Sequence, residues 1–152
     1  MEDNIQEMYQ KARKAFKQIE FWPQEKVDEM VLAVGWEWQK EKTAKVLART
    51  AIDESGIGVY EHKVAKIISK TRGSLLDMKG AKTCGVVKED KKKGIKILAK
   101  PIGVIGNVVP CTNPESTVCA LGVNILKTRN AMIASPHPRT QESTYLTVGY
   151  GR

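Results

Sequence analysis

Apolar side chains recur at intervals of three and four residues through the first half of the chain, which is the period of one helix face. This pattern predicts four helices within residues 1–80. Pro23 separates the first helix from the second, and Gly56 can adopt the left-handed conformation that ends the third. The fourth helix is predicted over 60–76, and its charged face places His62 at the surface.

From about residue 81 the pattern changes to alternation. Apolar residues alternate with lysines over 95–99, and a charged turn at 89–94 separates this segment from residues 83–87. Two such segments joined by a turn predict a β-hairpin with one face in water. The lysines at 91–93 are most simply the solvated tip of this hairpin rather than a phosphate-binding patch.

Residues 102–109 are apolar on both faces, as in a central parallel strand covered by helices. A helix over 115–128 and a second buried strand over 131–134 follow. This order predicts a βαβ unit, whose ligands bind beyond the carboxyl ends of the strands, at loops 110–114 and 135–139. The side chains expected to face inward on the helix are Val118, Leu121, Gly122 and Ile125.

The composition is that of an ordinary globular domain, since 41% of the 152 residues are apolar and 28% are charged. The net charge of +8 raises the possibility of a nucleic-acid partner. However, many basic residues lie between carboxylates on the predicted helices, which is typical of solvated helix faces. We therefore expect no nucleic-acid partner. We also expect no membrane partner, because no apolar run approaches the roughly 18 residues of a membrane span.

The cysteines argue for a reducing compartment. Cys84, Cys111 and Cys119 are odd in number and lack the paired spacing of metal ligands, so neither a disulfide framework nor a metal site is expected. The first ten residues are polar and acidic, unlike a secretory signal. These features predict a cytoplasmic protein.

Several blocks of the sequence closely resemble the CoA-acylating branch of the aldehyde dehydrogenase superfamily. This branch contains acetaldehyde dehydrogenases, the aldehyde dehydrogenase half of bifunctional aldehyde-alcohol dehydrogenases, and CoA-dependent succinate-semialdehyde dehydrogenases. The order and spacing of the blocks carry the resemblance, since any one of them alone is a weak signal. The blocks are ESGIGVYEHKV (54–64), KTCGV (82–86), KPIGVIGNVVPCTNP (100–114), LKTRNA (126–131) and SPHPR (135–139).

The resemblance implies an incomplete aldehyde dehydrogenase fold of the α/β class. It divides the chain into a helical N-terminus (1–80), a β-hairpin arm (81–100) and the βαβ start of a Rossmann-like, parallel-sheet NAD-binding domain (101–148). In the family the hairpin arm serves oligomerisation, so a homo-oligomer is expected. The catalytic domain is expected to lie in a later segment that this sequence does not contain.

The implied reaction converts an aldehyde, CoA and NAD reversibly to an acyl-CoA and NADH. In the family a cysteine thiolate attacks a small aldehyde, and the resulting thioester passes to CoA. Because that cysteine belongs to the later segment, we expect this chain alone to be inactive. The alternative is a non-catalytic NAD-binding or oligomerisation module. The choice between NAD and NADP, the identity of the aldehyde and association with a bacterial microcompartment stay open.

The resemblance also implies site residues. Thr112 or Asn113 takes the position of the superfamily's oxyanion-binding asparagine, although Asn113 can equally serve only as the N-cap of the following helix. Cys111 is interpreted as a small residue on the nicotinamide side rather than as the nucleophile, because no base accompanies it in the sequence. Cofactor contacts are implied for Val109, Pro110, Cys111 and Thr112 near the nicotinamide, and for Ser135, Pro136 and His137 near the adenosine ribose.

Overall fold

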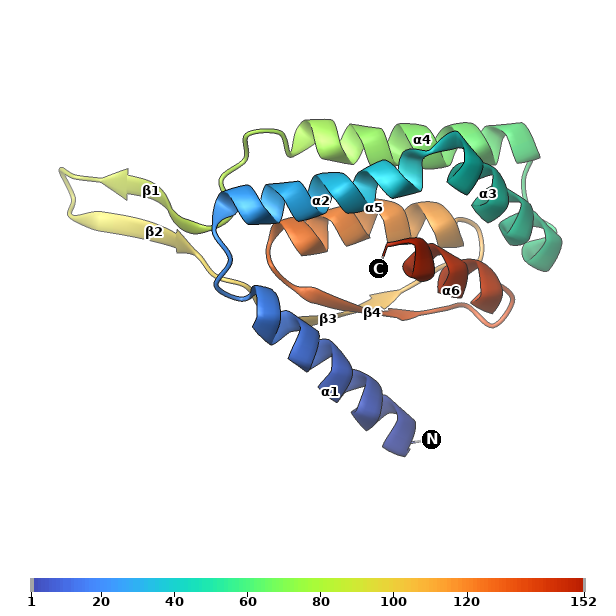
Figure 1. Ribbon diagram of the computed structural model, residues 1–152, viewed down its shortest axis with the longest axis horizontal. Helices are drawn as coiled ribbons and strands as arrows, with labels where there is room; N and C mark the ends of the chain where they lie inside the picture. The colour runs from blue at the N-terminus through green and yellow to red at the C-terminus, as the bar shows by residue number, and fades with distance from the viewer. Residues whose placement is uncertain (1, 152) are drawn as a thin grey trace.

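A computed structural model describes residues 2–151, with side chains from Asn4 onward (Figure 1). Helices come first, a hairpin follows, and a strand–helix–strand unit with one more helix completes the order, so the predicted α/β class is confirmed. None of the helices within these residues is long and apolar enough to cross a bilayer. The elements are α1 (Glu2–Ile19), α2 (Gln24–Gln39), α3 (Glu41–Ser55), α4 (Tyr60–Asp77), β1 (Gly85–Asp90), β2 (Ile95–Ala99), β3 (Val104–Val108), α5 (Pro114–Lys127), β4 (Ala131–Ser135) and α6 (Gln141–Tyr150).

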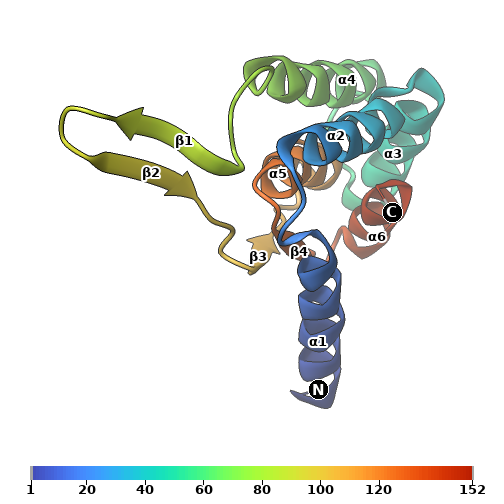
Figure 2. The same ribbon diagram turned by 60° about the vertical axis from the view of Figure 1, so that its left-hand side comes forward.

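Strands β3 and β4 form a two-stranded parallel sheet between helices. Helix α1 packs beneath the sheet, mainly against β4, and α5 lies on the other side (Figures 1 and 2). The other four helices, α2, α3, α4 and α6, pack around α5. This layering makes α5 the centre of the molecule and leaves the carboxyl ends of both strands at one edge of the sheet.

Side-chain and backbone hydrogen bonds fix the register of the two strands at both ends. The side-chain oxygen of Asn130 accepts hydrogen bonds from the backbone N–H groups of Ile102 at 2.7 Å and Gly103 at 2.8 Å. At the other end, the backbone N–H of Val109 donates to the carbonyl of Ser135 at 2.9 Å. A slip of one residue would break the hydrogen bonds at both ends of the strand pair, so these bonds oppose any change of register.

Two details of the predicted βαβ unit are wrong. The first strand was expected to be covered on both faces, but Ile102 and Val108 are 86% and 84% exposed, because α1 lies chiefly against β4. Leu121 was expected to face inward and is 44% exposed, whereas Val118 and Ile125 on the same helix are buried. The pattern located the strand and the helix correctly and failed where burial depends on neighbouring elements.

Trp38 ties the helical layer together. Its side chain is buried, and the indole N–H donates to the backbone carbonyl of Thr147 in α6 at 2.8 Å. The ring packs so closely against Gly122 of α5 that a Cβ there would lie 2.6 Å from Cη2. The largest buried aliphatic side chains of the surrounding core come from four helices and the loop after β3, and include Val27, Leu47, Ile67, Val109, Val118 and Val123.

The hairpin of β1 and β2 projects away from the helices (Figures 1 and 2). β1 continues to Asp90, past the start of the predicted turn, and the Asp90 carboxylate accepts hydrogen bonds from the backbone N–H groups of Lys92 and Lys93 at 3.1 Å. One face was expected to be buried, yet Ile97 and Leu98, on opposite faces, are 50% and 54% exposed. The arm therefore buries neither face against this chain.

We predict that Gly122→Ala lowers the free energy of unfolding by about 1–3 kcal/mol, because the added methyl group overlaps a Trp38 ring held in place by its own hydrogen bond. Gly73→Ala in α4 is the matched control, since no atom lies within 4 Å of the added carbon. The control should be neutral or stabilising by up to about 1 kcal/mol. Urea denaturation followed by circular dichroism measures both, and equal effects of the two substitutions would contradict the prediction.

Candidate functional site

The two loops predicted to form the site meet at one edge of the sheet. The first follows β3 and the second follows β4, and these strands end opposite each other at Val108 and Ser135. The hydrogen bond from Val109 to Ser135 joins the two loops directly. The sequence-based expectation that residues 110–114 and 135–139 share one edge is therefore confirmed.

Helix α4 holds the first loop through two lysines one turn apart. The ammonium of Lys63 donates to the backbone carbonyl of Thr112 at 3.0 Å, and that of Lys66 donates to the side-chain oxygen of Asn113 at 2.5 Å. The Asn113 amide nitrogen in turn donates to the Thr112 hydroxyl at 3.2 Å. Asn113 occupies the N-cap position of α5, but its side chain makes no capping hydrogen bond. Its side chain instead forms hydrogen bonds with Lys66 of α4 and with Thr112.

A buried ion pair lies beneath this loop. Lys63 on α4 and Glu115 in the first turn of α5 are 4% and 0% exposed, and their charged atoms are 3.4 Å apart. The Ser116 hydroxyl donates to the same carboxylate oxygen at 3.3 Å, while the second oxygen, Oε2, has no partner within residues 2–151. The position of the carboxylate at a helix N-terminus favours its charge. The pair anchors α4 to the start of α5.

The sequence analysis missed Lys63, Lys66 and Glu115. It treated the charged residues of the predicted helices as solvated, which is correct for most of them. The one available signal was the spacing of the two lysines, which places them on the same side of a helix. That signal does not identify the element that the helix packs against.

The second loop is held by α3. The Arg139 guanidinium donates to the backbone carbonyl of Ser55, and the backbone N–H of Arg139 donates to Nδ1 of His137 at 3.1 Å. This contact leaves Nε2 as the imidazole atom of His137 that is open to a ligand. Ser135 and Pro136 are exposed, and His137 is half-buried.

The N-terminus of α6, just after this loop, is capped by Glu54 from α3. Its carboxylate accepts hydrogen bonds from the backbone N–H groups of Glu142 at 2.8 Å and Ser143 at 2.7 Å, and from the Ser143 hydroxyl. Partial burial raises the pKa of the Glu54 carboxyl, but these hydrogen bonds outweigh the burial and hold its pKa below the ordinary value. The positive end of α6 is therefore already neutralised by the chain itself.

The three cysteines differ in setting. Cys119 is completely buried in α5, and this burial raises the pKa of its thiol strongly, which leaves it protonated and unreactive. Cys84 is buried beside Thr83. Cys111 is half-buried in the first loop, and within the described part of the chain its thiol has no hydrogen-bonded base. No group of three potential metal ligands occurs among residues 2–151.

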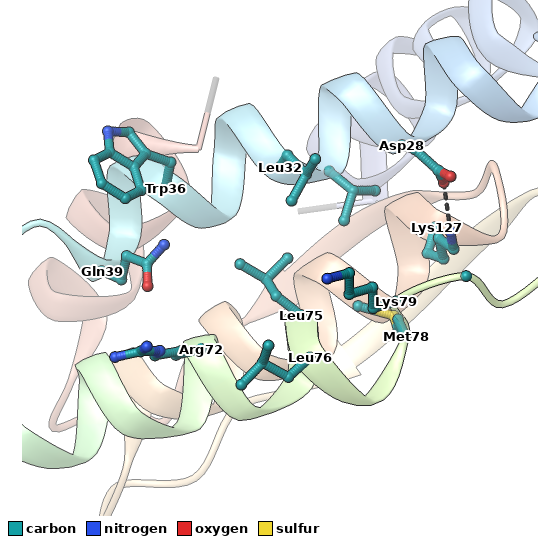
Figure 3. A pocket seen from close by; sticks show the side chains of 12 residues that line it. Asp28, Leu32, Trp36, Gln39, Arg72, Leu75, Leu76, Met78, Lys79 and Lys127 are labelled. Carbon is teal, nitrogen blue, oxygen red and sulfur yellow. Dashed lines mark hydrogen bonds and ion pairs between the residues drawn. The ribbon is translucent and has the colours of Figure 1, made fainter.

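Two of the hollows in the described structure lie mainly between helices. A groove of about 560 Å³ runs between α2 and α4, with Leu32, Leu75 and Leu76 along its walls (Figure 3). The ion pair between Asp28 and Lys127 closes one end. The second hollow, of about 460 Å³, lies between α1, β4 and α6 and has Pro136 at its margin. The first loop lines neither of these two hollows.

Known proteins resemble this chain in sequence and in fold. No family model matches the sequence. A sulfoacetaldehyde dehydrogenase from Acholeplasma sp is 42% identical over 142 residues, which make up 93% of this chain and 29% of that protein. The acetylating aldehyde dehydrogenase from Geobacillus thermoglucosidasius superposes with a TM-score of 0.92 at 27% identity, over 98% of this chain and 33% of that one.

A propionaldehyde dehydrogenase from Rhodopseudomonas palustris, solved with bound CoA and an acylated cysteine, superposes with a TM-score of 0.75 at 26% identity. The match covers 92% of this chain and 31% of that structure. The helices, the hairpin and the parallel unit thus have the fold of the N-terminal α/β part of aldehyde dehydrogenases. The relatives that are similar in sequence include a sulfoacetaldehyde dehydrogenase (acylating) and a succinate-semialdehyde dehydrogenase (acetylating), so within that class the chain resembles the CoA-acylating enzymes. It spans about a third of the length of these relatives.

We predict a pH-dependent contribution of Glu54 to stability. Because the folded-state pKa is below the ordinary value of 4.5, the contribution is complete above that pH and is lost as pH falls through the folded pKa. Glu54→Gln should therefore lower the melting temperature at pH 7 and flatten its decline on acidification. Glu29→Gln, at an exposed position of α2, is the control. Thermal melts between pH 7 and pH 3 check this, and parallel curves for wild type and Glu54→Gln would contradict it.

Proposed function

We propose that residues 101–139 form part of the cofactor crevice of an NAD-dependent, CoA-acylating aldehyde dehydrogenase. The reaction converts a small aldehyde, CoA and NAD reversibly to an acyl-CoA and NADH. The observation that carries the proposal is the meeting of loops 110–114 and 135–139 at the carboxyl edge of β3 and β4, joined by the hydrogen bond from Val109 to Ser135. Parallel α/β sheets bind their ligands at this edge.

The proposed cofactor contacts divide between the two loops. Val109, Pro110, Cys111 and Thr112 approach the nicotinamide ribose, and Ser135, Pro136 and His137 approach the adenosine ribose. The open Nε2 of His137 and the exposed hydroxyl of Ser135 support the second group, since both can hydrogen-bond a ribose diol. When bound, NAD would supply the hydride acceptor. The two loops of this chain would hold and orient the dinucleotide.

The proposed catalytic contribution of this chain is to hold the negative oxygen that forms when a thiolate attacks the aldehyde. Thr112 and Asn113 both carry donors at the start of α5, where donors act as charge develops on the substrate oxygen. None of the three cysteines has the setting of an activated thiol. We therefore propose that the nucleophile comes from a segment outside these 152 residues, as does CoA binding.

A second candidate is an oligomerisation module. The observation that favours it is the projecting hairpin, whose Ile97 and Leu98 remain half-exposed. The main proposal also includes homo-oligomers of the complete enzyme, which form through this arm. It further includes a cytoplasmic location, either free or within a bacterial microcompartment. The module hypothesis differs because it requires association without catalysis. Size-exclusion chromatography of the chain alone tests for association, and the activity of the chimera described next separates the two candidates.

The main proposal predicts that residues 1–148 can replace the aligned segment of the Acholeplasma enzyme. The chimera should reduce NAD in the presence of CoA and a short aldehyde, because the two parts complete one crevice. The chain alone should not. Absorbance of NADH and chromatography of the acyl-CoA measure the reaction. A folded chimera with no activity would overturn the proposal, as would acyl-CoA formation by the chain alone.

A second prediction concerns the oxyanion. In the chimera, replacing Thr112 by Val together with Asn113 by Ala should lower kcat by roughly 10-fold to 100-fold, since donors aimed at a developing oxyanion act in the transition state. KM for NAD should stay nearly constant. Thr50→Val on α3, which removes a hydroxyl far along the chain from the loops, is the control. Steady-state kinetics check this, and an unchanged kcat in the double variant would exclude both residues.

A further inference from the structure

The contact between Lys66 and Asn113 determines which way the Asn113 amide faces. An ammonium group carries only hydrogen-bond donors, so the Asn113 atom 2.5 Å from it must be the oxygen. The amide nitrogen is thereby turned toward Thr112, to whose hydroxyl it donates at 3.2 Å. Without Lys66 the two orientations of the amide would differ little in energy.

The hydrogen bonds consequently run in one direction. Lys66 donates to Asn113, and Asn113 donates to the Thr112 hydroxyl oxygen. Because that oxygen accepts a bond, its own proton is free to point outward, and the Thr112 side chain is exposed. The Thr112 hydroxyl proton finds no acceptor among the described residues. The chain of bonds therefore begins at a positive charge and ends at an unused donor.

The backbone of the loop follows the same pattern. The Thr112 carbonyl accepts from Lys63 at 3.0 Å and so faces α4. Lys63 is fixed by its buried pair with Glu115. The Thr112 carbonyl and the Asn113 side-chain oxygen are thus both turned toward α4. The Thr112 hydroxyl remains as a donor near the positive end of α5.

Chains of hydrogen bonds polarise one another, so the ammonium at one end strengthens the donor at the other. We infer that Lys66 is the positioning residue of the oxyanion site. Lys66 fixes the orientation of the Asn113 amide, the amide fixes the Thr112 hydroxyl, and this hydroxyl donates to the substrate oxygen. This inference deepens the proposed function and rests on it. It assigns distinct roles to two residues that the sequence did not distinguish. Thr112 contacts the oxyanion, and Asn113 links Lys66 to the Thr112 hydroxyl and so fixes the orientation of that hydroxyl.

Nuclear magnetic resonance of the isotopically labelled 152-residue chain tests the inference without any ligand. The wild type should show a cross-relaxation peak between the Asn113 side-chain amide protons and the Thr112 side chain. Lys66→Met should abolish this peak, because the amide is then free to turn over. Lys66→Arg should keep it, since a guanidinium also carries only donors. Lys66→Glu should abolish it too, because a carboxylate attracts the amide nitrogen away from Thr112.

Lys70→Met, at an exposed position one turn further along α4, is the matched control and should leave the peak intact. Unshifted backbone amides of core residues such as Val118 verify that each variant is folded. Persistence of the peak in both Lys66→Met and Lys66→Glu would overturn the inference, as would its loss in Lys66→Arg. An NAD titration of the same samples addresses the proposed function separately, so a chain with the expected peaks and no NAD binding would contradict only the latter.

Discussion

The register between β3 and β4 is the constraint on which the rest of the structure depends. Asn130 fixes the strands where they begin, and the bond from Val109 to Ser135 fixes them where they end. Because side chains alternate between faces, a shift of one residue would exchange the inner and outer sides of the strand that slips. It would also move the two loops apart. The meeting of the loops at one edge therefore depends on a few backbone and amide hydrogen bonds.

The edge of the sheet also depends on a stable position of the first loop. Helix α4 holds this loop through Lys63, whose burial costs free energy. Removing Lys63 and Glu115 from water is unfavourable unless their contacts compensate for lost hydration. Lys63 gains the Thr112 carbonyl and Glu115 gains the Ser116 hydroxyl, yet Oε2 of Glu115 stays without a partner within residues 2–151. Through the bond from Lys63 to the Thr112 carbonyl, the pair also fixes the backbone of the first loop.

The sequence predicted the parts of this structure that depend on local pattern. Helical period, turn residues and the βαβ order located the elements and brought both loops to one edge. It failed where burial or a contact depends on another element: Leu121 was expected to face inward and is 44% exposed, and Lys66 binds Asn113 across 47 positions of the chain. The N-cap position of Asn113 was predicted correctly, but its side chain serves α4, since a stronger donor competes with the helix backbone.

The hairpin arm and the two loops lie at opposite ends of the molecule (Figure 1). Substitutions at well-separated sites usually have additive effects on free energy. A substitution at the charged tip or at an apolar residue of the arm should therefore leave the hydrogen bonds that position the two loops intact. The arm can tolerate changes in sequence that the loop edge of the sheet cannot.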